Sequence, residues 1–263
     1  MTIALIKTGS INLECIKTDC ISIQSIKKIF LLVPMLSVLV SSAIAAESKD
    51  DPILTKVIVD QFERRDADDD NPLVLDGQGW IGKDLRKLWF KTQLERVDGE
   101  NEKAELQALY SRGVTTFWDF QLGLRKDFET GANEKPDRSW AVIGFQGLAP
   151  YFFEIDTALF IGESGRLALR MEAEYEWLFT QRLILTPDIE VNVYGQHDEA
   201  TGAGSGLSDI ELGLRLRYEI RREFAPYIGV NWMKAYGNSA DFARRENEDT
   251  RDAQLVIGVR AWF

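Results

Sequence analysis

The feature that most constrains the fold is a two-residue alternation of apolar side chains that runs to the last residue of the chain. Leu255, Ile257, Val259, Ala261 and Phe263 share one face of a strand, because successive side chains of a strand point to opposite sides. Bacterial outer-membrane barrels usually end on such an aromatic strand. A soluble sandwich can also produce one strand of this kind, so repetition of the pattern decides between the two.

The alternation returns about ten times, each time over the roughly ten residues that a tilted strand needs to cross a bilayer. It excludes an amphipathic helix, whose apolar neighbours recur at three and four residues. One segment, residues 139–148, is apolar on both faces and is the least regular. The predicted strands are Arg86–Val97, Lys103–Arg112, Trp118–Arg125, Ser139–Leu148, Tyr151–Ile161, Arg166–Trp177, Gln181–Tyr194, Ile210–Arg217, Phe224–Lys234 and Gln254–Phe263.

The connections between these strands alternate in length, which predicts the orientation. Short links near residues 113–115, 149–150, 178–180 and 220–223 alternate with mostly longer, polar links such as 128–138, 195–207 and 235–252. Outer-membrane barrels have short periplasmic turns and long outer loops, so we expect both chain ends to face the periplasm. This requires an even strand number, about ten within a range of 8–12.

The first residues have the pattern of an export signal. Lys27 and Lys28 precede an apolar run, and small residues follow at 43–45, so we predict a signal peptide over 1–45. Both cysteines, Cys15 and Cys20, lie in that segment. We expect a periplasmic arm over 46–85 and a barrel over 86–263.

Charge excludes one class of partner. Without residues 1–45 the chain keeps 27 Lys and Arg against 40 Asp and Glu, a net charge of −13. A chain this acidic is repelled by the phosphate backbone, so we expect no nucleic-acid partner.

The polar faces of the strands predict what lies inside. A soluble, lipocalin-like barrel would turn its charges outward, but the export signal and the terminal Phe263 favour a barrel that faces lipid and encloses its charges. Roughly balanced signs then indicate either cross-bracing ion pairs or a charged ion path. The predicted lumen charges are Glu154, Asp156, Arg170, Glu172, Glu174, Arg182, Glu190, Glu211, Arg215, Arg217 and Arg260.

Catalytic and metal-binding signals are weak. His197 is the single histidine and is followed by Asp198 in a predicted outer loop. Such a pair can activate water, yet adjacent residues seldom face each other, so we expect no enzyme and keep a rim hydrolase as a third hypothesis. Reduced copper prefers thioether, thiolate and imidazole ligands. The candidates are Met233, on the predicted lumen face, and His197, while Met171 points to lipid.

Several motifs resemble the copper resistance protein B family of Gram-negative outer membranes. The resemblance covers nearly the whole chain after the predicted signal peptide. It lies in Asp60-Gln-Phe-Glu-Arg-Arg-Asp66, Gly79-Trp-Ile-Gly82, Lys87-Leu-Trp-Phe-Lys-Thr92, Phe117-Trp-Asp-Phe-Gln121, Gly147-Leu-Ala-Pro-Tyr-Phe-Phe-Glu154, Leu169–Leu185, Gly204-Ser-Gly-Leu-Ser-Asp209 and Arg217-Tyr-Glu-Ile-Arg-Arg-Glu-Phe-Ala-Pro-Tyr227.

The resemblance implies copper as the metal and a role in copper resistance at the outer membrane, by copper binding or by export from the periplasm. Family members often carry an arm rich in Met and His, and residues 46–78 contain neither. The alternative is a small general pore or structural barrel without metal specificity. The expected partners are outer-membrane lipids and a periplasmic copper-binding protein, which could contact the acidic stretches at Asp50-Asp51 and Asp66–Asp70.

Overall fold

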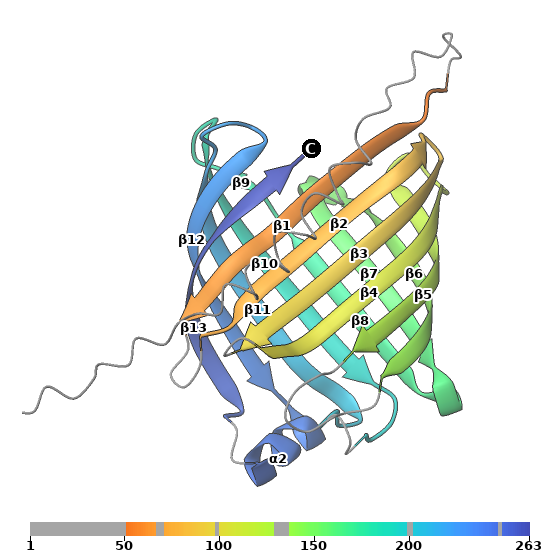
Figure 1. Cartoon of the computed structure of the whole chain (residues 1–263), viewed down its shortest axis with the longest axis vertical. Coiled ribbons are helices and arrows are strands. Elements are labelled where there is room, and N and C mark those ends of the chain that lie inside the picture. Colours follow the sequence, from red (N-terminus) through yellow and green to blue (C-terminus); the bar gives the residue numbers. More distant parts are fainter. Residues whose placement is uncertain (1–50, 67–70, 98–99, 129–136, 199–201, 247–248) are drawn as a thin grey trace, which may run out of the picture. The chain divides into compact units, whose positions relative to one another are not determined.

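The computed structural model describes residues 51–66, 71–97, 100–128, 137–198, 202–246 and 249–263, and their strands form one closed antiparallel barrel (Figure 1). Short β9 pairs with the same edge of β10 as β8 does, so the ring of described strands has twelve members. The strands are β1 (Leu54–Asp66), β2 (Leu73–Lys83), β3 (Arg86–Val97), β4 (Glu100–Gly113), β5 (Trp118–Phe128), β6 (Arg138–Ala149), β7 (Phe153–Gly162), β8 (Leu167–Glu174), β9 (Trp177–Leu178), β10 (Leu183–Tyr194), β11 (Gly206–Tyr218), β12 (Phe224–Ala235) and β13 (Arg251–Trp262).

The barrel closes between its first and last strands. The N–H of Val57 donates to the carbonyl of Phe263 at 3.0 Å, and the N–H of Phe263 donates to the carbonyl of Val57 at 2.8 Å. Closure removes the exposed edges that an open sheet would offer to other chains. The start of β1 and the end of β13 therefore lie at the same end of the barrel.

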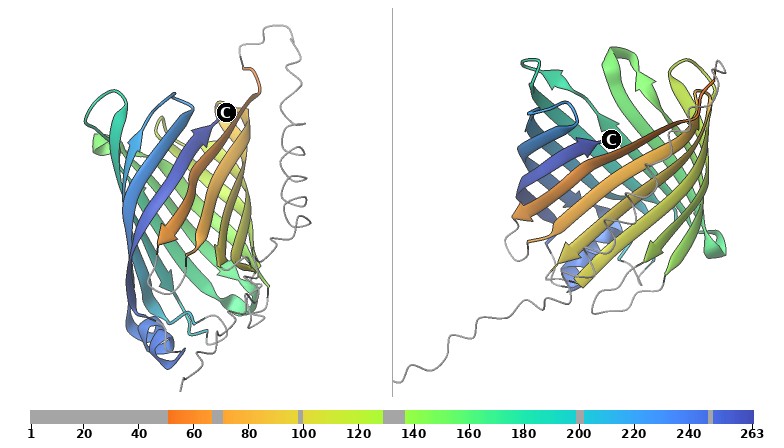
Figure 2. Two further views of the ribbon diagram at one scale, coloured as in Figure 1. Left: turned by 60° about the vertical axis from the view of Figure 1, so that its left-hand side comes forward. Right: turned by 45° about the horizontal axis from the view of Figure 1, so that its top comes forward.

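That end, which we call the turn end, carries the short links, including the 3₁₀ turn η2 (Pro150–Phe152). The opposite end, the loop end, carries the links after β1, β3, β5, β7, β10 and β12, with the 3₁₀ turn η3 (Glu163–Gly165) and the helix α2 (Gly237–Glu246). Figure 2 shows α2 at that end. Among the described residues, no helix combines the length and apolar composition needed to span a bilayer.

The predicted antiparallel barrel is confirmed, but one of its details is wrong. The ring has twelve strands, at the upper limit of the predicted range of 8–12, whereas β1 and β2 occupy most of the segment predicted as a periplasmic arm over 46–85. The predicted signal peptide, 1–45, lies outside the described residues. Asp66 ends β1 at the loop end, away from the turn end where the predicted periplasmic contact would be needed, and the rest of that acidic stretch, residues 67–70, lies outside the described residues.

Two local features explain why these strands were missed. The pairing of β1 shifts register at a bulge after Val59, so that Asp60 and Gln61 both line the interior and the alternation breaks. In β2, Gly77 and Gly79 occupy outward positions where other strands carry apolar side chains.

Apolar side chains cover the outside and also fill part of the inside. On β13, Leu255 and Ile257 are 63% and 64% exposed, whereas Val256 between them is 4% exposed. The inward residues of β6 are apolar near the loop end because they belong to a buried interior cluster, which explains why this strand is apolar on both faces. The cluster comprises Trp89, Leu109, Trp140, Val142, Phe160 and Ala168.

Candidate functional site

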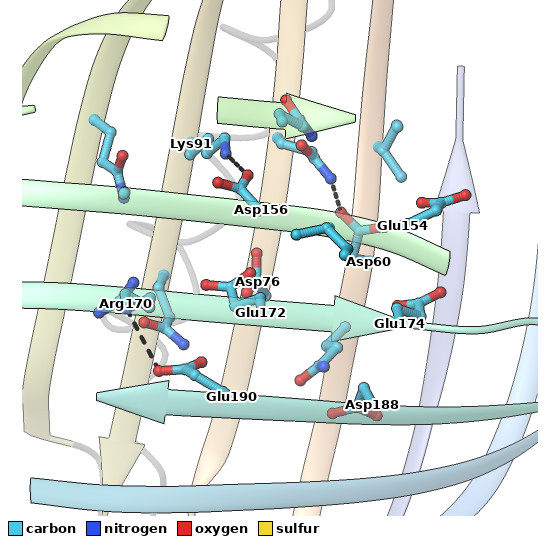
Figure 3. A pocket seen from close by; sticks show the side chains of 18 of the residues that line it. Asp60, Asp76, Lys91, Glu154, Asp156, Arg170, Glu172, Glu174, Asp188 and Glu190 are labelled. Atoms are coloured by element: carbon cyan, nitrogen blue, oxygen red, sulfur yellow. Dashed lines mark hydrogen bonds and ion pairs between the residues drawn. The ribbon is translucent and has the colours of Figure 1, made fainter. Parts of the chain in front are cut away.

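The barrel encloses a cavity of about 480 Å³ lined by residues of β1–β8, β10, β11 and β13 (Figure 3). Among the described residues that line it, ten are Asp or Glu and five are Lys or Arg. The cavity therefore carries a surplus of negative charge. Its carboxylates are Asp60, Asp76, Glu105, Glu154, Asp156, Glu172, Glu174, Asp188, Glu190 and Glu211.

Seven of these carboxylates share one side of the cavity, on β7, β8, β10 and β11, which we call the acidic wall. The register sets Asp156, Glu172, Glu190 and Glu211 directly opposite one another across these four strands. A second row, nearer the turn end, sets Glu154, Glu174 and Asp188 opposite one another. Directly opposite side chains have Cβ atoms only about 4.5–5.5 Å apart, and like charges there repel.

The facing side of the cavity carries six amides among its other side chains. Each of the strands β1 to β6 contributes one glutamine to the lining, and we call this surface the amide wall. Amides donate and accept hydrogen bonds without carrying charge. Its members are Gln61, Gln78, Gln93, Gln107, Gln121 and Gln146.

Cations on other strands pair with most of the acidic wall. Lys91 binds Asp156, and Arg260 lies 3.6 Å from Glu174. Arg65 pairs with Glu211 at 3.0 Å. Figure 3 shows Lys91 and Asp156 converging from different strands.

Two buried groups brace the barrel across its interior. In the first, Glu63 accepts hydrogen bonds from Arg65 at 2.8 Å, from Arg215 at 2.9 Å on each oxygen, and from the hydroxyl of Tyr227 at 2.8 Å. The Glu63 side chain is fully buried. A buried carboxylate is tolerated only when charge and hydrogen bonds compensate it, and here both do.

The second brace joins Glu105 on β4 to Arg125 at 2.7 Å and to Arg170 at 3.0 Å. The ring of Phe160 stacks on both guanidinium groups, with centroid distances of 4.5 Å and 5.6 Å. Cation–π contacts of this kind strengthen when water is excluded. The brace and the interior apolar cluster together fill part of the lumen.

Glu172, Asp76 and Glu154 differ from the other carboxylates of the cavity. Within the described part of the chain, none of the three forms an ion pair or a side-chain hydrogen bond, although all line the cavity. Glu172 lies between Asp156 and Glu190 in the first row. These three carboxylates are thus available to a cationic ligand.

The structure gathers most of the predicted lumen charges. Eight line the cavity: Glu154, Asp156, Arg170, Glu172, Glu174, Glu190, Glu211 and Arg260. Arg215 and Arg217 line a smaller adjoining pocket. Arg182 is wrongly predicted, because it lies exposed in the turn between β9 and β10.

Sequence reasoning missed other lining charges and the sign of their sum. Asp60 and Asp76 were assigned to the arm, while Lys91, Glu105 and Asp188 fall within predicted strands and have the inward parity of their neighbours. Alternation alone was therefore sufficient to find the last three. With all of them included, the predicted near balance of charge becomes an acidic surplus.

The geometry around His197 does not support the rim hydrolase. The N–H of Ser205 donates to Nδ1 of His197 at 3.3 Å, and the Ser205 hydroxyl lies 3.3 Å from Nε2. Nδ1 of His197 accepts its hydrogen bond from a backbone N–H, so no carboxylate orients this ring as one orients the base of a hydrolase. Asp198 pairs with Arg138 and Arg166.

Met233 lies opposite Glu211 and Asp252 and is 40% exposed. Asn231 and Tyr227, which share its parity on β12, are almost fully buried. In the described ranges, no group of three or more His, Cys, Asp or Glu residues is arranged to hold a metal ion. Of the two weak metal candidates, Met233 and His197, the histidine therefore belongs to no such group.

Comparisons with known proteins identify the family. The family model described as copper resistance protein B precursor matches residues 53–263. Copper resistance protein B of Escherichia coli is 47% identical over 207 residues, which cover 79% of this chain and 69% of that protein. The homolog from Pseudomonas syringae pv. tomato is 45% identical over 214 residues, covering 81% and 71%.

Among solved structures, the NanC porin superposes with a TM-score of 0.52 at 12% identity, covering 79% of this chain and 99% of that one. At this identity the likeness concerns the fold alone, and it is the fold of an outer-membrane porin. The family match extends over β1 and β2 as well as the strands predicted from alternation. The chain is thus an outer-membrane β-barrel, and it belongs to the copper resistance protein B family.

Proposed function

We propose that this barrel contributes to copper resistance by letting copper ions, as cargo, leave the periplasm through its lumen. The observation that carries the proposal is the acidic surplus of the cavity, ten carboxylates against five cationic side chains. Family membership supports copper as the ion, and the charge of the lumen supports the passage of a cation rather than an anion.

The Coulomb attraction between a lumen carboxylate and a divalent cation has a strength that suits conduction. One unpaired carboxylate about 7 Å from a divalent cation, in a medium as polar as water, lowers the energy of that cation by roughly 1 kcal/mol. An attraction this weak concentrates ions without trapping them, as conduction requires. Salt reduces it, because charges further apart than about 8 Å are screened at physiological ionic strength.

Passage is better supported than storage. The carboxylates of the acidic wall are spread in two rows over four strands. The soft donors of the described residues, Met171, Met233 and His197, lie on different elements, and Met171 is 47% exposed on β8. Reduced copper prefers several such donors at one point, so we assign the lumen to an ion path.

The direction of transport follows from the proposed orientation, with the turn end in the periplasm. Glu154 is the second residue of β7 and Glu174 ends β8 at the turn end, where both face the cavity. A periplasmic copper-binding protein would deliver its ion to this mouth. The long polar links and α2 would then face the outside of the cell.

A structural barrel or general pore remains the second candidate, favoured by a specific observation. The two braces and the interior apolar cluster fill part of the lumen. If these side chains block passage, the charges serve stability alone.

Two measurements separate these candidates. In the native host, deletion of the gene should lower copper tolerance, and re-expression of the wild-type chain should restore it. In planar bilayers under a potassium chloride gradient, the reversal potential should indicate cation selectivity, reduced in Glu172→Gln and unchanged in Glu163→Gln. Glu163 is exposed in η3, so its variant is the same chemical change outside the cavity. Unchanged growth across a copper series, with an anion-selective or closed barrel, would refute the proposal.

A further inference from the structure

We infer that the lumen accepts a divalent cation in its hydrated form, through hydrogen bonds from the coordinated waters to the acidic and amide walls. The inference rests on the proposed function and deepens it, because it names the cargo as hydrated divalent ions in general. Copper would then pass at a rate similar to that of other ions of the same charge and similar size.

The first support is the division of the lining between carboxylates and amides. Water bound to a divalent cation is a strong hydrogen-bond donor, and both carboxylate and amide oxygens accept such bonds. A bare ion would instead need several oxygens converging at about 2.0–2.2 Å. The carboxylates of the acidic wall form rows, and the amides face them from six other strands.

The second support is a buried polar group without a partner on the same cavity. Trp89 lines the cavity and is only 8% exposed, yet its Nε1 has no hydrogen-bond partner. Oε1 of Gln93, which also lines the cavity from β3, and Oε1 of Glu174 lack hydrogen-bond partners as well. Buried donors and acceptors are normally satisfied, by water where no protein group is near. An indole donor cannot bind a bare cation, so it indicates a water-filled cavity.

The third support is size. A hexahydrated ion needs roughly 180 Å³, because each water takes about 30 Å³ of liquid volume. The cavity, at about 480 Å³, accommodates such an ion with further water around it. Stripping the hydration shell is therefore unnecessary at this point of the path.

Glu172 is the residue that we assign to discrimination by charge. Asp156 and Glu190, its neighbours in the row, are paired with Lys91 and Arg170. Glu172 has no such partner among the described side chains and lines the cavity. Its side chain therefore faces the ion, and its replacement by glutamine should weaken passage of every divalent ion by the same factor.

The test uses the full-length barrel in liposomes that contain a divalent-sensitive dye. Influx of Cu²⁺, Ni²⁺, Zn²⁺ and Co²⁺ should agree within about threefold, since hydrated ions of equal charge feel the same Coulomb attraction. Glu172→Gln should reduce all four rates on the order of fivefold, and Glu163→Gln should leave them unchanged. Retained folding of each variant is checked by its heat-modifiable migration on gels.

Electron paramagnetic resonance of Cu²⁺ added to the barrel gives an independent readout. The spectrum should match that of the aqua ion, without nitrogen hyperfine lines. Copper influx at least tenfold faster than that of Ni²⁺, or a spectrum with protein nitrogen ligands, would overturn the inference and leave the proposed copper passage standing. Influx of no divalent ion above empty liposomes would instead overturn the proposed function itself.

Discussion

Replacement of Glu63 by glutamine tests whether β1 is part of the barrel and how strongly the first brace holds it. Glu63 accepts four hydrogen bonds, two on each carboxylate oxygen. In Glu63→Gln one oxygen becomes an NH₂ group, so two acceptor positions are lost and a donor then faces other donors. The remaining bonds also lose the charge that strengthened them.

The expected cost follows from these contacts. Removing one member of a buried ion pair typically costs about 3–5 kcal/mol. Arg215 keeps Asp188 at 2.6 Å, and Arg65 keeps Glu211 at 3.0 Å. These remaining partners place the loss near the lower limit, about 3 kcal/mol. The population of unfolded barrel would rise by roughly two orders of magnitude, at about 1.4 kcal/mol per factor of ten.

The assay is urea unfolding of the refolded barrel in lipid vesicles, followed by tryptophan fluorescence. With a slope of about 2 kcal/mol per molar urea, the midpoint should fall by roughly 1.5 M. Glu163→Gln, at an exposed position, should stay within about 0.5 kcal/mol of the wild type. A loss below about 1 kcal/mol in Glu63→Gln would refute the reasoning, because a solvated arm would tolerate the change.

Three further variants test other parts of the site. Glu172→Gln should raise the free energy of unfolding by about 0.5–2 kcal/mol, because it removes two like-charge contacts in the row; a loss in urea titrations would contradict this. Burial raises the pKa of Glu176, but the hydrogen bond and charge of Arg217 and the charge of Arg260 lower it further, so its pKa is below the usual range. Glu176 therefore stabilises the barrel at pH values above the pKa of the unfolded chain, and this stabilisation is lost as the pH falls through the lowered pKa. In Glu176→Gln the melting temperature should depend less on pH between pH 5 and pH 3, roughly the range around the pKa of an ordinary carboxyl. Met233→Ala should change copper influx by less than about twofold, since one thioether is a poor site, and a larger loss in the dye assay would restore Met233 as a ligand.

Alternation predicted strands reliably where every second residue faces lipid, as in β3, whose bounds agree with the prediction. It failed at β1 because a bulge shifts the parity between Val59 and Phe62. A bulge adds one residue to one strand and leaves no mark in composition. This bulge and the glycines of β2 are the two reasons why ten strands rather than twelve were located and why the arm was predicted too long.

The pairing of interior charges is a different kind of information. Glu63 and Arg215 are 152 residues apart in the chain and meet only because β1 closes against β13. Parity tells which side chains point inward, but the register between strands decides which of them meet. The carboxylate row across β7, β8, β10 and β11 depends on three registers at once. Its members were predicted as lumen charges, whereas their adjacency required the structure.

The row also favours the proposed ion path over a merely structural barrel. Each pair of directly opposed carboxylates costs a few tenths of a kcal/mol or more, and the two rows contain five such pairs. A barrel selected for stability alone would gain by replacing Glu172 with glutamine, which matches the amide wall across the cavity. The braces at Glu63 and Glu105 supply stability that offsets the repulsion. Retaining an unpaired charge at a net cost is expected where the charge serves function, and an acidic row facing water serves the passage of cations.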